Sequence, residues 1–110
     1  MTVSELIDSN EFSIINTGAD TQRDISCVFC CDMLSIAMSR APSGCAWVTV
    51  MGNINTLAVA SLCDAACIIL AAGVCLDPNA SQKAVEKGIT VLASDRPIFD
   101  TALIIHDKLK

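Results

Sequence analysis

The chain has 110 residues, of which 53% are apolar, 17% charged and 4% aromatic, and its net charge at neutral pH is −5. A chain of this length is expected to form one domain around one core, and its apolar fraction excludes a largely disordered protein. The acidic balance and the scattered lysines and arginines argue against binding to nucleic acid or to an anionic membrane surface.

Cysteine usage and the N-terminal segment both indicate a cellular location. Residues 1–12 contain neither a basic region nor an apolar stretch, so we expect no secretory signal and a cytoplasmic protein. The longest apolar run, 65–76, is much shorter than the roughly 20 residues that a membrane-spanning helix needs, so no membrane anchor is expected. The seven cysteines form an odd count and lie mostly in apolar runs, which favours free, buried thiols over disulfides.

The first part of the chain is expected to form a helix, two strands and a second helix, with the alternation of strand and helix beginning at residue 27. Thr2 and Glu5 have the spacing of a capping box, which predicts a short helix over about residues 3–9. Strand-like apolar runs follow at 12–16 and 25–30, separated by a polar loop. Asp32 is then expected to be the N-cap of a helix over 33–41.

The second part continues the same alternation. Gly52 and Asn53 precede a helix that is apolar on more than one side and should therefore be covered on more than one side. Asp77, Pro78 and Gly88 bracket another helix of about ten residues, and Pro97 begins the last one. The remaining strands are expected at 45–51, 66–70 and 89–93.

The predicted fold class is α/β: a single domain over 1–110, with a mostly parallel β-sheet of about five strands and helices on both faces. Strands alternate with helices from residue 27 onward, and their apolar character is too uniform for a sheet with one solvated face. Such alternation implies parallel strands joined by right-handed crossovers.

A parallel α/β sheet binds ligands beyond the carboxyl ends of its strands. The turns after the predicted strands therefore supply the candidate ligand-binding residues, which are Asp32, Gly52, Asn53, Asn55, Gly73, Asp95 and Arg96. Structural roles are open for several of them. Asp32 and Asn53 are suitable helix N-caps. Arg96, the only positive charge among them, suits an ion pair with Asp95 or Asp100 as well as a ligand phosphate or carboxylate.

The chain shows no convincing catalytic set. Both glycine-rich phosphate motifs, GxGxxG and GxxxxGK[ST], are absent, and His106 has no serine or cysteine partner that the sequence places beside it. We therefore expect a protein that is not an enzyme and that needs no cofactor. A carboxylate base at Asp32 or Asp95 is the less favoured catalytic alternative.

Cys27, Cys30 and Cys31 offer a redox or metal-handling alternative. A metal site needs about four ligands, and the chain has no second CxxC and no histidine pair. The CxxC also lies in a predicted strand, whereas redox pairs lie at a helix N-terminus that lowers the thiol pKa. Core packing and no metal are therefore expected, with Cys31 as the thiol best placed to be reactive.

Six stretches, taken together in order and spacing, resemble the stand-alone form of the DRTGG domain family: 31–35, 38–41, 46–50, 53–60, 64–70 and 88–92. The resemblance covers nearly the whole chain. It implies a small α/β regulatory or ligand-binding module that is often dimeric, similar to the N-terminal domain of HPr serine kinase/phosphorylase and to the DRTGG module of phosphotransacetylases. It also implies adenine nucleotides as ligands, and a partner enzyme or a hydrogenase or kinase system.

The resemblance places the two family turns at identifiable positions. The Gly-Asp-Arg turn falls on residues 52–54, which read Gly-Asn-Ile, and the Thr-Gly-Gly turn falls on 71–73, which read Ala-Ala-Gly. Neither the acid nor the arginine of the first turn is present here, and an arginine is the natural partner of a phosphate.

The expected function is a non-catalytic module that binds a small ligand at the strand ends and acts as a homodimer or docks on a partner enzyme. The apolar helix expected after Asn53 motivates the homodimer, because it carries more apolar surface than a single core contact requires.

Overall fold

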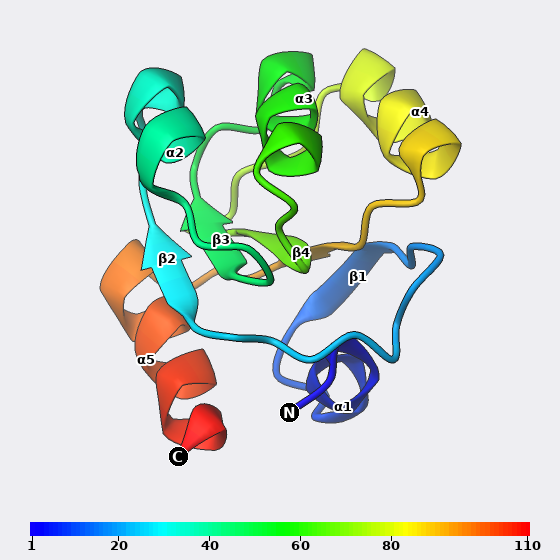
Figure 1. The fold of residues 1–110 in the computed structure, drawn as a ribbon. Coiled ribbons are helices and arrows are strands. Elements are labelled where there is room, and N and C mark those ends of the chain that lie inside the picture. Colours follow the sequence, from blue (N-terminus) through cyan, green and yellow to red (C-terminus); the bar gives the residue numbers. More distant parts are fainter.

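The computed structural model describes residues 1–110, and strands and helices alternate in it from β2 to the C-terminus (Figure 1). In chain order they are α1 (Val3–Asp8), β1 (Ser13–Asn16), β2 (Val28–Cys30), α2 (Leu34–Arg40), β3 (Ala46–Thr49), α3 (Ile54–Leu62), β4 (Cys67–Leu70), α4 (Pro78–Lys87), β5 (Val91–Ala93) and α5 (Ile98–Leu109). The predicted α/β class is confirmed.

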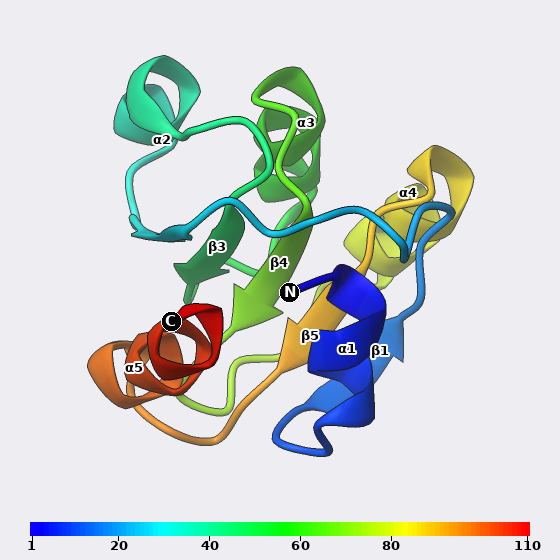
Figure 2. The ribbon, with the colours of Figure 1, turned by 60° about the horizontal axis from the view of Figure 1, so that its bottom comes forward.

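The five strands form one sheet in the order β1-β5-β4-β3-β2. β2, β3, β4 and β5 are parallel, whereas β1 runs antiparallel to β5, with Ser13 opposite Ala93 and Ile14 opposite Leu92 (Figure 2). Every residue of β3 and β4 is buried, which explains their uniformly apolar sequences. The mostly parallel sheet is therefore confirmed, and β2 and β1 are its two edges.

Helices cover both faces of this sheet, as predicted. α2, α3 and α4 lie on one face, and α1 and α5 lie on the other (Figure 1). Successive side chains of β3 alternate between the two layers: Trp47 packs in the cluster under α2, α3 and α4, and Ala46 and Val48 pack in the cluster with α1 and α5. Each layer thus has its own apolar core.

The ends of the helices follow the sequence signals at most positions. Thr2 and Glu5 form the capping box of α1, and Asn53 caps α3 by accepting a hydrogen bond from the Thr56 N–H at 3.1 Å. α4 begins at Pro78 and ends at Lys87, and its C-cap is Gly88, whose φ of 65° is left-handed. These interactions are local in sequence, so a sequence pattern can predict them.

Asp32 is the exception, and its predicted role as a helix cap is wrong. α2 begins at Leu34, and its N-cap, Met33, makes no side-chain hydrogen bond. The Asp32 carboxylate instead accepts hydrogen bonds from the Thr49 hydroxyl at 2.7 Å and from the Val50 N–H at 3.0 Å. Thr49 is fully buried, and a buried hydroxyl without a partner is costly, so this tertiary interaction prevails over the cap.

α3 is covered as its sequence predicts. It lies between α2 and α4 (Figure 1), and Thr56, Leu57, Val59 and Ala60 are buried. Most of its apolar surface therefore serves the core of this domain.

The longest helix, α5, has 12 residues. None of the helices combines the length and apolar character that crossing a membrane requires.

Candidate functional site

Two adjoining cavities lie at the carboxyl ends of β4 and β5. Their volumes are ≈ 300 Å³ and ≈ 420 Å³, and both are lined by Ser13, Ala93, Ser94 and Asp95. We call the pair the β5 cleft, because these shared residues lie at the end of β5 and at the beginning of β1. Ligands of parallel α/β sheets bind at this edge.

The two parts of the β5 cleft differ in chemistry. Ile15, Val74 and Leu76 give the smaller cavity an apolar wall. The larger cavity is mostly polar and is bordered by Glu11 and Arg96. The cleft therefore suits a ligand with an apolar part and a polar part.

Asp95 lines both cavities. Its side chain is exposed, and it forms no salt bridge and no side-chain hydrogen bond within the chain. A Cβ atom added at Gly73 would lie 3.6 Å from its Oδ1 atom, so the β4–α4 and β5–α5 connections meet here. Asp95 is thus a carboxylate that is free to accept hydrogen bonds from a ligand.

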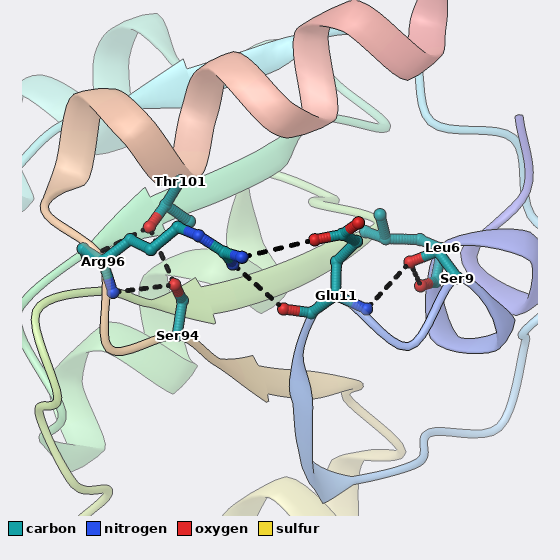
Figure 3. Close-up of polar contacts among 6 residues, drawn as sticks. All are labelled: Leu6, Ser9, Glu11, Ser94, Arg96 and Thr101. Carbon is teal, nitrogen blue, oxygen red and sulfur yellow. Dashed lines mark hydrogen bonds and ion pairs between the residues drawn. The ribbon is translucent and has the colours of Figure 1, made fainter.

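Arg96 is held by Glu11 and not by Asp95 or Asp100, the ion-pair partners considered from the sequence. One guanidinium nitrogen lies 3.3 Å from the Glu11 carbonyl oxygen, and another lies 3.5 Å from its carboxylate (Figure 3). The α1–β1 connection brings Glu11 to Arg96 because β1 pairs with β5. No local pattern could show this contact between residues 85 positions apart.

The Ser94 side chain organises the turn after β5. The Ser94 hydroxyl oxygen accepts from the Arg96 N–H at 3.1 Å, and it lies 3.1 Å from the Thr101 hydroxyl (Figure 3). Thr101 is buried in α5. This network fixes the turn that presents Asp95.

Two peptide N–H groups of the β4–α4 connection donate to carbonyl groups of the β5–α5 turn. The Ala72 N–H donates to the Arg96 carbonyl at 2.7 Å, and the Gly73 N–H donates to the Ser94 carbonyl at 3.0 Å. Both residues have positive φ, 56° and 72°, a conformation that favours glycine and is uncommon for alanine. The connection thus joins the β5–α5 turn and does not present these two donors to the cleft.

Gly52, Asn53 and Asn55 lie outside the β5 cleft. A Cβ atom at Gly52 would lie 2.3 Å from the Cys75 carbonyl oxygen, and the Asp77 N–H donates to the Gly52 carbonyl at 2.8 Å. The connection after β4 therefore occupies the space beside Gly52. Asn53 is used as a helix cap, and Asn55 is an exposed residue of α3.

The structure consequently divides the predicted ligand-binding residues into two groups. Gly73, Asp95 and Arg96 border the cleft, whereas Asp32, Gly52, Asn53 and Asn55 do not line either cavity. Sequence reasoning missed Ser13, Ile15 and Glu11. They reach the carboxyl edge only because the first strand returns antiparallel beside the last, and no residue pattern in their own segment signals that placement.

Cys27, Cys30 and Cys31 do not lie together on one face of the sheet. Cys27 and Cys31 pack against the core under α2, α3 and α4, whereas Cys30 lines a groove beside α5 on the other face. Residues three apart on a strand point to opposite faces, so the CxxC thiols diverge. All seven thiols are free, and no group of three His, Cys, Asp or Glu side chains is arranged to hold a metal ion.

Burial also opposes ionisation of several thiols. It raises the pKa of Cys45 and that of Cys67 to about 12. Desolvation raises the pKa of the Cys30 thiol above its usual value, and the negative charge of Asp32 adds to this effect. These thiols therefore remain protonated at neutral pH.

A second polar cluster lies at the amino edge of the sheet. The Arg23 guanidinium donates to both carboxylate oxygens of Asp64 at 2.7 Å, and the Ser43 hydroxyl donates to Asp64 at 2.6 Å. These hydrogen bonds lower the pKa of Asp64 well below its usual range. The cluster ties the loop before β2 to the end of α3, so we interpret it as structural.

Comparison with known proteins does not assign a family: no protein-family model matches the chain, and no curated protein matches it. The resemblance to the DRTGG family therefore rests on the sequence segments described above.

Proposed function

We propose that this protein is a non-catalytic regulatory module that binds a small molecule in the β5 cleft, as the resemblance to DRTGG domains implies. The observation that carries the proposal is the cleft itself, which lies at the edge where α/β sheets bind ligands and combines an apolar wall with the free carboxylate of Asp95. Adenine nucleotides are the first ligands to test, because the resemblance implies them.

Binding explains the side chains of the cleft better than catalysis does. Glu11 and Arg96 form an ion pair with each other. Asp95 and the Cys75 thiol are therefore the ionisable side chains of the β5 cleft that have no partner. Nucleophilic catalysis requires a base in hydrogen-bond reach of the nucleophile, and Cys75 forms no side-chain hydrogen bond. The chain is therefore proposed to sense a ligand and not to convert it.

The position of Cys75 gives a direct test, because its exposed thiol lines the smaller cavity. Saturating adenosine, AMP or ATP should slow alkylation of Cys75 by iodoacetamide, as measured by mass spectrometry over time. The alkylation rate of glutathione in the same solution is the control and should not change. The proposal fails if neither these ligands nor a wider panel of metabolites protects Cys75 or raises the melting temperature.

For assembly, we propose a homodimer through the β2 edge of the sheet and not through α3, whose apolar surface is largely covered. The helices α2 and α5 flank β2 on its two faces (Figure 1). Five of the eight large exposed apolar side chains lie on these two helices or at the N-cap of α2. They are Met33, Ile36, Met38, Phe99 and Leu103. Scattered apolar residues need no partner, but a concentration on one side indicates an interface.

The two edge strands differ in a way that supports this face. β1 has an irregular register between Ile14 and Asn16, a device that discourages further strand pairing. β2 has no such irregularity, no proline and no charged residue. The groove of ≈ 290 Å³ between β2 and α5 is lined by five apolar residues and His106, without a carboxylate, lysine or arginine, so two copies related by a twofold axis would not set like charges together.

A second copy is thus the proposed occupant of this edge, and a partner enzyme is the competing occupant. Sedimentation velocity of the purified chain should show a dimer at tens of micromolar. A clean monomer at that concentration would remove the homodimer and leave docking on a partner enzyme.

The alternative redox or metal-handling function for Cys27, Cys30 and Cys31 has less support, because their side chains lie on two faces of the sheet. It requires bound zinc or iron in protein purified without oxygen, or an unusually acidic thiol. A metal content well below one atom per chain, together with ordinary alkylation rates at all three thiols, would exclude it. The free thiols agree with a reducing compartment, and we propose the cytoplasm.

A further inference from the structure

We infer that the β5 cleft selects ligands that present hydrogen-bond donors, and no negative charge, to Asp95. This inference rests on the proposed ligand-binding function and narrows its chemistry. It predicts that uncharged nucleosides and aromatic amines bind more tightly than phosphorylated compounds or carboxylates.

The first support is the charge of the cleft. Arg96 is the only cation that lines either cavity, and its guanidinium is bonded to the Glu11 carbonyl and carboxylate. Their charges cancel, so the carboxylate of Asp95 leaves the cleft with a net negative charge. An anionic group placed at Asp95 would meet repulsion without a free cation to offset it.

The second support is that the turn which the resemblance aligns with Thr-Gly-Gly offers no free peptide donors to the cleft. Phosphate sites in α/β proteins commonly use consecutive backbone N–H groups that point into the cleft. Here three consecutive N–H groups of the β4–α4 connection, those of Ala72, Gly73 and Val74, donate to the carbonyl oxygens of Arg96, Ser94 and Ala71. The turn that the resemblance aligns with Thr-Gly-Gly is thus closed to a phosphate.

The polar side chains that remain free near Asp95 can all act as acceptors. Asp95 offers two carboxylate oxygens, and the Ser13 and Ser81 hydroxyls form no hydrogen bond within the chain. A carboxylate at a strand end binds a ribose diol or an ammonium group by accepting its hydrogen bonds. Ile15, Val74 and Leu76 provide an apolar wall for an attached ring.

Matched pairs of ligands test whether the cleft prefers donor groups to anionic groups, independently of whether it binds ligands at all. Adenosine and AMP share a base and a ribose but differ in the phosphate, and tyramine and 4-hydroxyphenylacetate share a phenol ring but differ in the sign of the charge. Each is titrated into ¹⁵N-labelled protein while the amide signals of Gly73, Cys75 and Asp95 are followed. We expect adenosine and tyramine to bind at least about tenfold more tightly than their anionic counterparts.

The possible results distinguish the two proposals. Equal or tighter binding of AMP or 4-hydroxyphenylacetate overturns the selection for donors and leaves the ligand-binding function in place. If none of the four compounds, nor ATP, moves the cleft amides at millimolar concentration, the proposed function fails together with the selection.

A substitution at Asp95 completes the test. Asp95→Asn keeps the size of an exposed side chain that makes no contact needed for folding. It should weaken the binding of adenosine and of tyramine by about tenfold, and it should narrow the difference in affinity between the two members of each pair. Asp107→Asn is the matched control, because it removes the same charge at the far end of α5, outside the cleft. Unchanged affinity in Asp95→Asn overturns the inference.

Discussion

The Asp32 carboxylate is the only side-chain acceptor for the hydroxyl of Thr49, which is fully buried at the end of β3. Removing that acceptor leaves the hydroxyl and the Val50 N–H without their partner, and hydrogen bonds to charged groups contribute about 1.5–3 kcal/mol. Asp32→Ala should therefore lower the free energy of unfolding by about 2 kcal/mol, whereas Asp32→Asn, which keeps an acceptor oxygen, should cost less than about 1 kcal/mol. Urea unfolding at neutral pH measures both, and near-zero losses in the two variants would contradict this structural role.

Asp64 should make stability depend on pH in the acid range. Hydrogen bonds from Arg23 and Ser43 lower its pKa in the folded state below the ordinary 3.8, so the unfolded chain takes up a proton at a higher pH than the folded chain does. This stabilisation is present above pH 3.8 and is lost as the pH falls toward the folded pKa. Glu5, whose pKa the Thr2 cap lowers, adds a contribution of the same sign.

The corresponding variant isolates the contribution of Asp64. Asp64→Asn should be less stable than the natural chain at neutral pH, and the difference in melting temperature should shrink as the pH falls below 3.8. Glu5 titrates in both proteins, so its contribution cancels in the comparison. A difference that stays constant down to the lowest pH at which both proteins fold would exclude the proposed pH dependence.

At the scale of elements, local patterns predicted every helix and strand but not the partner of each strand. The capping box at Thr2, the cap at Asn53 and the Pro78–Gly88 pair involve residues within a few positions of each other, so they are visible in sequence. The place of β1 beside β5 depends on residues more than seventy positions apart, such as Asn16 and Val91. Part of the candidate site was therefore missed, because Ser13, Ile15 and Glu11 enter it through that pairing.

Gly52→Ala tests whether this glycine is required by the packing of the β3–α3 connection against the β4–α4 connection and not by contact with a ligand. Alanine there would place a methyl group 2.3 Å from the Cys75 carbonyl oxygen, and a backbone atom cannot move aside as a side chain can. We expect Gly52→Ala to cost about 2–3 kcal/mol in urea unfolding. Gly73→Ala adds the same methyl group where the nearest atom is 3.6 Å away, so its cost of about 1 kcal/mol should come from its left-handed φ alone. The interpretation is wrong if Gly52→Ala costs no more than Gly73→Ala.

At the scale of the whole molecule, the two edges of the sheet should respond differently to a charge. The Ala46 N–H donates to the Cys27 carbonyl, and the Cys31 N–H donates to the Val48 carbonyl, so residues 27 and 31 direct polar backbone groups to β3. By the alternation along a strand, the N–H and C=O groups of Val28 and Cys30 point away from the sheet. They are available to the same strand of a second copy.

A lysine at this edge would place two like charges together in a symmetric dimer and discourage strand pairing. Cys30→Lys should therefore raise the dimer dissociation constant at least about tenfold in sedimentation velocity, because each tenfold corresponds to only about 1.4 kcal/mol. Ile14→Lys introduces the same side chain at an exposed position of the opposite edge strand and should leave the dimer intact. Circular dichroism would show that both variants keep the fold. If Ile14→Lys dissociates the dimer and Cys30→Lys does not, the interface lies at β1 and the assignment to β2 is wrong.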